Sequence, residues 1–497
     1  MKVIRRRRLF YDQRRSNLYR IFGLLLVILI AGWVVLRLST GTLRSPFAAT
    51  MTPTRSSQSL TMEGQTFFDA GNLSSAITAY QAAAGVDPTD ATVLAQLARI
   101  QAYSSRLLTT DPERLTRLTD AQKSIDQAAV LAPNDSTVHA IRAFVYDWLA
   151  DPALDSLRAA GDKNAAALMV QAEQEGLLAI SQDPRNALAL AFYAEILIDE
   201  QKWDQASQNI QQALSLDPNT MDVHRVYAYL LESTGYYNDA ITEYQNALKF
   251  SPNLTFLYIS IGRNYRELAI KSTSDSEQSQ LYDAALQNFS QAVAINQTLG
   301  IQDTIPYTEI AKTYSQLGQF YPAELNALKA LSFDPTNADL YGRLGIIYDK
   351  ARNYESVIPA MQCVVSGCTP EISCQARFAT SCQGSEGVTV KPLPLTANSD
   401  VYYYTYGTVL AALSPIHPEY CKTAIQVLDQ VQAAYGTDPN VAAIVADGLA
   451  ICASVATQQA QTPTLGATPT LVPTPRFTPV FGTQAPHTSI DTPNYIP

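Results

Sequence analysis

Two consecutive segments of 34 residues match each other without a gap, and this self-similarity constrains the fold more than any other feature of the chain. The segments are Ala187–Thr220 and Met221–Leu254. Equivalent positions carry small residues, a large aromatic residue or a closing proline: Ala194 and Ala228, Trp203 and Tyr237, Ala206 and Ala240, Ala213 and Ala247, and Pro218 and Pro252. A fixed period of this length predicts a solenoid, in which each unit packs on its neighbours.

The same spacing recurs in a unit that begins near Ser57 and in Thr304–Asn337. It resembles the tetratricopeptide repeat, a helix-turn-helix unit of about 34 residues. The resemblance covers about residues 57–439. It implies an all-α solenoid of eight or nine repeats with a closing helix, in which small residues let paired helices approach closely and proline ends the second helix.

Several units depart from the plain repeat length. The second and third units are longer by about 11 and 17 residues, and the sixth contains the insertion KSTSDSEQSQ and has Gln297 where proline is expected. These insertions fall between the two helices of a unit, so they should project from one edge of the solenoid. They are either tolerated surface excursions or one side of a binding surface. In the eighth unit, Pro359 should kink or shorten the second helix.

The pattern divides the chain into segments. Repeats one to eight occupy residues 57–364, followed by a Cys-containing insertion (365–399), and by a degenerate ninth repeat with a capping helix (400–457). The Thr/Pro-rich tail (458–497) cannot build a core and is expected to be disordered. It resembles the wall-spanning or glycosylated stalks of bacterial envelope proteins, with an inert tail as the alternative.

The N-terminus has the composition of a membrane anchor. Residues 1–20 are strongly basic, and Ile21 to Leu36 is an unbroken apolar run. We expect a signal-anchor helix over residues 21–38 and a flexible linker over residues 39–56, with residues 1–20 in the cytoplasm. The repeats would then lie outside the membrane of a bacterial cell. The alternative is a signal peptide that is cleaved near Ser39–Gly41.

The cysteines point to the same compartment. All six follow residue 360, and an even, clustered number outside a membrane suggests disulfides. The repeat geometry brings the start of one helix to the end of the next antiparallel helix, which predicts a bond between Cys421 and Cys452. The other four would pair among themselves: Cys363, Cys368, Cys374 and Cys382. Zinc is the competing explanation, but no C-x2-C knuckle is present.

Charge and motifs bound the function. The net charge is −10 although the N-terminus is basic, and an acidic body argues against nucleic-acid binding. The sequence contains no phosphate-binding loop, nucleophile elbow or metalloprotease motif, so we expect no catalytic residue, metal or cofactor and no enzymatic activity. His139 and His224 occupy the fourth position of their repeats and should be partly buried structural residues.

The inner face of the solenoid is the expected binding surface for protein or peptide partners. Five residues are predicted to face inward there as a basic and aromatic partner-binding patch: Arg225, Tyr229, Arg263, Arg266 and Lys312. Their guanidinium and ammonium groups could bind carboxylates of a partner, or they could be ordinary solvated charges. The sequence therefore favours a non-catalytic scaffold. The alternative is a surface protein that binds solutes or glycans through the stretch Tyr402–Tyr406 and the disulfide region.

Overall fold

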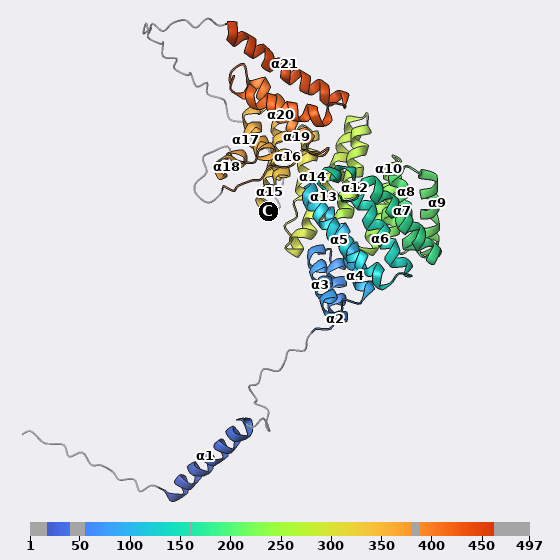
Figure 1. The fold of residues 1–497 in the computed structure, drawn as a ribbon, viewed down its shortest axis with the longest axis vertical. Helices are drawn as coiled ribbons and strands as arrows, with labels where there is room; N and C mark the ends of the chain where they lie inside the picture. Colours follow the sequence, from blue (N-terminus) through green and yellow to red (C-terminus); the bar gives the residue numbers. More distant parts are fainter. Residues whose placement is uncertain (1–16, 40–54, 160, 379–386, 462–497) are drawn as a thin grey trace, which may run out of the picture. The chain divides into compact units, whose positions relative to one another are not determined.

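The structure is a computed structural model that describes residues 17–39, 55–159, 161–378 and 387–461. It is divided into two compact units, residues 1–343 and 344–497. The described residues form α-helices, one 3-10 helix and an isolated β-bridge between Cys368 and Val390 (Figure 1). The tail segment 462–497 and the anchor-proximal segments 1–16 and 40–54 lie outside the described residues.

The first unit contains the following helices in chain order: α1 (Leu18–Ser39), α2 (Ser57–Asp69), α3 (Leu73–Val86), α4 (Ala91–Ser105), α5 (Asp111–Leu131), α6 (Ser136–Leu149), η1 (Pro152–Leu157), α7 (Ala165–Gln182), α8 (Ala187–Asp199), α9 (Trp203–Leu216), α10 (Met221–Ser233), α11 (Tyr237–Phe250), α12 (Thr255–Lys271), α13 (Asp275–Leu299), α14 (Ile305–Gln316) and α15 (Phe320–Phe333). From α2 onwards they pack as antiparallel pairs, and α16 (Ala338–Lys350) crosses into the second unit.

Small residues at the eighth position of each repeat explain how tightly the paired helices pack. In the first unit these positions are all buried: Gly64, Ala98, Ala143, Ala194, Ala228, Gly262 and Ala311. A Cβ atom at Gly262 would lie only 2.4 Å from the ring of Phe289, which is itself fully buried. A larger side chain there would overpack the interface between α12 and α13.

The fourth position of a repeat ties that repeat to the preceding one. In four units its side chain contacts the carbonyl oxygen of the proline that ends the previous unit: His139 with Pro133 at 3.0 Å, His224 with Pro218 at 2.9 Å, Tyr258 with Pro252 at 3.1 Å, and Tyr341 with Pro335 at 2.9 Å. Both histidines also contact a glutamate, at 2.5 and 2.7 Å. These histidines therefore have a structural role.

The insertions become helix as well as loop. α5 has 21 residues and α13 has 25, whereas the regular second helices α9 and α11 have 14. The absence of proline at Gln297 lets α13 continue to Leu299, where Gly300 ends it in the left-handed conformation with φ 66°. The insertion of the third unit instead forms η1 and the loop before α7.

The first unit coils tightly enough for distant repeats to touch. The side-chain amide of Asn253, just before α12, donates to the backbone carbonyl of Asp69 at the end of α2, at 3.2 Å and 184 residues away. The guanidinium of Arg99 on α4 pairs with the carboxylate of Asp222 on α10. The end of α2 therefore contacts the segment before α12, and α4 contacts α10 and α12.

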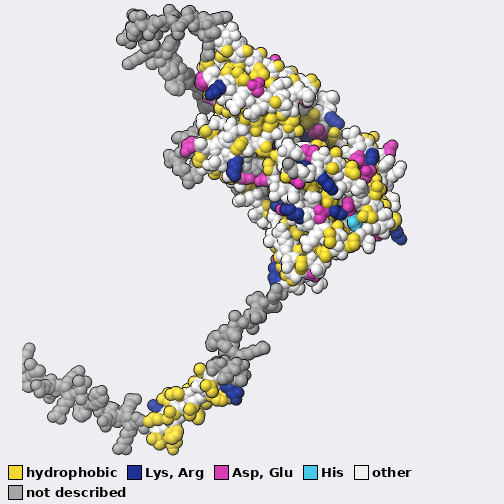
Figure 2. All heavy atoms as spheres, viewed as in Figure 1, with side chains coloured by type: hydrophobic (Ala, Val, Ile, Leu, Met, Phe, Trp, Pro, Cys, Tyr) yellow, Lys and Arg dark blue, Asp and Glu magenta, His cyan; other side chains and the backbone are white. Residues whose placement is uncertain are grey.

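Helix α1 differs from every helix of the repeats because its described side chains are all exposed and mainly apolar. Residues 18–37 have a mean hydropathy of 2.3, and this length and composition suit a membrane span. Figure 2 shows this helix covered by hydrophobic side chains, with basic side chains near its two ends. Residues 439–458 of α21 pass the same test, but they are 28% buried in the second unit.

The second unit contains α17 (Tyr354–Val365), α18 (Pro370–Phe378), α19 (Asp400–Leu413), α20 (Tyr420–Tyr435) and α21 (Pro439–Gln461). Helix α17 continues through Pro359 and has 12 residues. Disulfides join Cys421 on α20 to Cys452 on α21, and Cys363 to Cys368. Cys374 is also disulfide-bonded, and Cys382 lies outside the described residues. The sulfur atoms of the five described cysteines are in disulfides and are therefore not available as thiolate metal ligands.

Candidate binding site

Aromatic side chains fill the middle of the coil that the first unit forms. The ring of Tyr103 on α4 stacks on Phe256 of α12 at 5.2 Å between centroids and lies 5.1 Å from Phe144 of α6. Phe144 in turn stacks on Phe192 of α8 at 4.5 Å. First helices of four repeats, α4, α6, α8 and α12, thus contribute to one packed cluster. An extended peptide cannot occupy the inner face at this level, because the side chains of the protein already fill it.

A buried ion pair lies against this aromatic cluster. The guanidinium of Arg225 on α10 donates to both carboxylate oxygens of Glu195 on α8, at 2.8 and 2.6 Å. Arg225 is only 3% exposed, and its guanidinium lies over the rings of Tyr103 and Phe144 at 5.3 and 5.5 Å. The two hydrogen bonds to the carboxylate and the contacts with the ring faces stabilise the guanidinium, which is removed from water.

A second buried carboxylate collects two arginines between α12 and α14. Glu309 accepts from Arg263 at 2.6 Å and from Arg266 at 2.6 Å. Arg266 is 4% exposed, whereas the side chain of Arg263 remains 39% exposed. Lys312 is exposed one turn further along α14, and restricted hydration together with nearby Arg266 lowers its pKa. This end of the unit therefore concentrates positive charge.

The structure separates the predicted partner-binding residues. Arg225 and Arg266 are buried and form internal ion pairs, so little of either guanidinium is accessible to a partner. Burial forces each guanidinium to find a carboxylate within the fold. The half-buried Tyr229 donates a 2.6 Å hydrogen bond to Asp199. Arg263 and Lys312 remain accessible.

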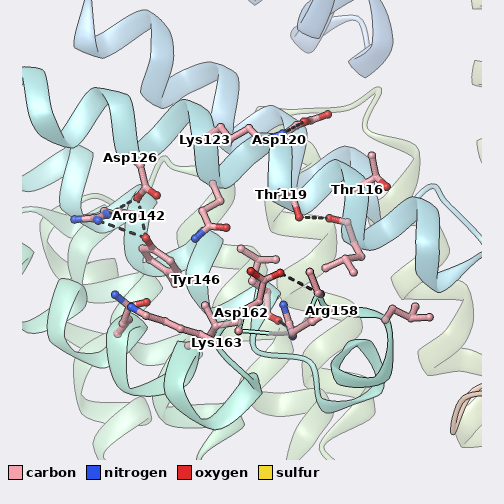
Figure 3. Close-up of a pocket in the computed structure, with 18 residues that line it drawn as sticks. Thr116, Thr119, Asp120, Lys123, Asp126, Arg142, Tyr146, Arg158, Asp162 and Lys163 are labelled. Carbon is pink, nitrogen blue, oxygen red and sulfur yellow. Dashed lines mark hydrogen bonds and ion pairs between the residues drawn. The ribbon is translucent and has the colours of Figure 1, made fainter.

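The insertion of the third repeat forms one wall of a polar cleft of about 760 Å³ (Figure 3). Its other walls come from α5, α6 and α7, and charged side chains of both signs line it. Many of these charges are already paired: Arg142 donates to Asp126 at 2.9 Å, and Tyr146 donates to the same carboxylate at 2.8 Å. The insertion therefore shapes a surface hollow, and the cleft offers polar groups of both signs.

The tyrosines of the proposed solute-binding stretch are mainly structural. Tyr402, Tyr403 and Tyr406 on α19 are buried, and the hydroxyl of Tyr403 donates to the backbone carbonyl of Leu393 at 2.6 Å. Aromatic side chains that pack into the second unit cannot stack on an external sugar ring. This stretch therefore does not supply the exposed aromatic surface that the alternative function requires.

Sequence reasoning missed a small acidic pocket formed by α6, α8 and α10. It contains the buried Asp147 and also Asp199 at the end of α8. Restricted hydration and nearby Glu195 raise the pKa of Asp199 to about 6, against the hydrogen bond from Tyr229 that lowers it. The available signal was Asp147 itself, because an acidic residue within the apolar stretch AFVYDWL is unusual on a core helix.

No protein-family profile matches the sequence, and no curated protein matches it. Among solved structures, the human IFIT1 dimer with PPP-AAAA is 14% identical, with a TM-score of 0.48 over 80% of this chain and 83% of that chain. A tetratricopeptide repeat protein from Parabacteroides merdae is 17% identical, with a TM-score of 0.33 over 59% of this chain and 98% of that one. A thermophilic repeat protein from Thermus thermophilus is 20% identical, with a TM-score of 0.33 over 42% and 98%.

The fold class is set by the described helices, which pack as pairs at the repeat spacing. The repeat body is an all-α solenoid of the tetratricopeptide type, and the predicted fold class is confirmed. It is preceded by one N-terminal apolar helix of sufficient length to span a membrane.

Proposed function

We propose that the protein is a non-catalytic scaffold that α1 anchors in the cell membrane and that binds protein partners on the extracytoplasmic side. The observation that carries this proposal is the fully exposed apolar helix α1 joined to a folded repeat body that contains disulfides. The basic residues before α1 favour a cytoplasmic N-terminus, and disulfides persist in oxidising compartments outside the cytoplasm. Both arguments support an extracytoplasmic position of the repeats.

The most suitable partner surface is the accessible basic end of the first unit. Arg263 and Lys312 are accessible beside the buried pair of Arg266 and Glu309, and the neighbouring Arg343 adds to the positive field that lowers the pKa of Lys312. An acidic segment of a partner protein would neutralise this field. The oligonucleotide in the human IFIT1 structure belongs to that protein, and the acidic body of the present chain favours a protein partner.

The anchor predicts how the protein distributes between membrane and soluble fractions. Substituting Arg for both Leu26 and Leu29 in α1 should move most of the protein out of the carbonate-resistant membrane fraction. Each charge at mid-membrane costs about 2.5–3.5 kcal/mol on insertion scales. Protease added to intact spheroplasts should digest the repeats of the wild type. Repeats that are protected in spheroplasts, or a double variant that stays in the membrane, would contradict the proposed anchor and topology.

The basic surface predicts a loss of partner capture on charge substitution. In membranes, the double variant Arg263→Gln and Lys312→Glu should reduce crosslinking to protein partners by about tenfold, because two accessible donors to carboxylates are lost. A matched control is Lys249→Glu on α11, where an exposed lysine donates a hydrogen bond to Asn246 of the same helix. Equal capture by wild type and double variant would reject this surface and leave the membrane topology untouched.

A further inference from the structure

The small acidic pocket contains a buried carboxylate that has no hydrogen-bond partner in the part of the chain that the structure describes. The pocket has a volume of about 240 Å³ and lies where α6, α8 and α10 meet the connection between α4 and α5. Asp147 on α6 lines it and is only 3% exposed. Neither carboxylate oxygen of Asp147 has a hydrogen-bond partner among the described residues.

The other carboxylates of this pocket are all satisfied within the fold. Asp151 accepts from Arg114 at 3.0 Å, Glu195 accepts from Arg225 and from the indole of Trp148 at 3.1 Å, and Asp199 accepts from Tyr229. Asp147 is therefore the exception in an otherwise paired cluster. Buried polar groups in proteins are nearly always hydrogen-bonded, because leaving a charge unpaired away from water is costly.

The charges around Asp147 show what kind of group is missing. Four carboxylates share the pocket with the guanidinium groups of Arg106 and Arg114, and Arg225 lies behind Glu195. Carboxylates outnumber guanidinium groups here, and Arg114 is shared with Asp111 at 3.0 Å. A bound cation would offset this excess of negative charge.

We propose that this pocket binds the ammonium or guanidinium head of an organic cation, which donates hydrogen bonds to both oxygens of Asp147. A guanidinium or ammonium group can satisfy two acceptor oxygens at once, and charge-assisted bonds of this kind are strong. The pocket volume suits such a head with a short alkyl stem. No group of three or more His, Cys, Asp or Glu side chains in the described ranges is placed to hold a metal ion, so the geometry favours an organic cation. The inference is independent of the membrane topology.

Binding of this kind depends on pH in a defined direction. Burial raises the pKa of Asp147 well above its ordinary value, with further contributions from Asp199 and Glu195. Because the pKa of Asp147 is higher in the folded protein, protonation of this carboxyl stabilises the fold, and this contribution is fully present below the unfolded pKa of 3.8. The contribution is lost as pH rises through the pKa of the folded state. A bound cation favours the ionised carboxylate, so affinity should increase from pH 5.5 to 8. The charged or titratable neighbours are Arg106 after α4, Arg114 on α5, Asp151 after α6, Glu195 and Asp199 on α8, Glu200 after α8, and Arg225 and Tyr229 on α10.

Calorimetric titration of the full chain in detergent micelles tests the proposal. Methylguanidinium and ethylammonium are the probes, and tetramethylammonium serves as a cation without N–H donors. At pH 7.5 we expect saturable binding of at least one of the two probes, weaker binding at pH 5.5, and none of tetramethylammonium. The substitution Asp147→Asn should reduce affinity at least tenfold, since a hydrogen bond to a charged group contributes about 1.5–3 kcal/mol.

Controls make the test decisive. Asp147→Asn removes the ionisable group at constant size, so the thermal midpoint of the unliganded protein should not fall. An unchanged midpoint would show that a loss of binding in this variant is not caused by unfolding. Asp283→Asn, on the exposed side of α13, should bind as the wild type does. Two blocked tripeptides with a central Arg or Lys test whether the cation is a side chain of a partner protein. Binding of a tripeptide would indicate a side chain, and binding of the small probes alone would indicate a free amine or guanidine. No saturable binding of either probe, or unchanged affinity in Asp147→Asn, would overturn the proposal.

Discussion

An Asp222→Ala variant is expected to unfold with a free energy about 3–5 kcal/mol below that of the wild type, as measured by urea denaturation of the full chain in detergent. The buried carboxylate of Asp222 on α10 pairs with Arg99 on α4 and accepts a hydrogen bond from the hydroxyl of Tyr103. Removing it leaves a largely buried guanidinium and a buried hydroxyl without their acceptor. The loss should be large because both groups lose water on folding.

The same variant should loosen the coil at a defined place. Asp222 joins residues more than a hundred positions apart, so hydrogen exchange should accelerate first in α4 and α10. Asp222→Asn keeps the size and an acceptor oxygen and should lose less stability. Asp283→Ala on the exposed side of α13 should change stability by less than about 0.5 kcal/mol. An Asp222→Ala variant as stable as this control would show that the contact does not hold the repeats together.

Replacing Glu309 by Ala should cost a similar amount, about 3–5 kcal/mol, because two guanidinium groups lose their shared carboxylate. Arg266 is buried and has no route to water, whereas the more exposed Arg263 can become solvated. Most of the loss should therefore come from Arg266. The double variant Glu309→Leu with Arg266→Met should recover part of the stability, since paired apolar side chains often replace a buried ion pair without cost.

The acid dependence of Glu309 gives an independent test. Burial alone would raise the pKa of Glu309, but the ion pairs with Arg263 and Arg266 outweigh it and hold the pKa well below the ordinary value of 4.5. The stability from this carboxylate is therefore present above pH 4.5 and is lost only as pH falls towards the folded pKa. The difference between wild type and Glu309→Ala should be constant from pH 7 to about 5 and shrink below it. Glu63→Gln, in an exposed pair with Arg55, should show almost no difference at any pH.

Much of the architecture could be predicted from spacing. A 34-residue period with small residues at fixed positions requires closely packed helix pairs, because only such residues allow contacts like that of Gly262 with Phe289. The insertions also fell where a repeat tolerates them. Whether they formed loop or helix depended on local signals, such as the missing proline at Gln297.

The candidate site was less predictable, because ion pairs between repeats do not follow the repeat period. Arg225 lies 30 residues after Glu195, and Arg266 lies 43 residues before Glu309. The pairs are set by how far each repeat rotates on the next one. The repeat pattern alone therefore predicts that an inward-facing residue is accessible, even when neighbouring repeats bury it in the folded coil.

The sequence by itself determined the helical repeat, the apolar N-terminal helix and the positions of the cysteines, since these follow from periodicity and composition along the chain. Only the tertiary structure decided that Tyr103 meets Phe256 and Asp222 across several repeats, and that Asp147 remains buried and unpaired. The physical reason is the small rotation between neighbouring repeats, which accumulates over five units and brings inner side chains together. Such an accumulated rotation depends on every interface of the coil, so no single segment of the sequence contains it.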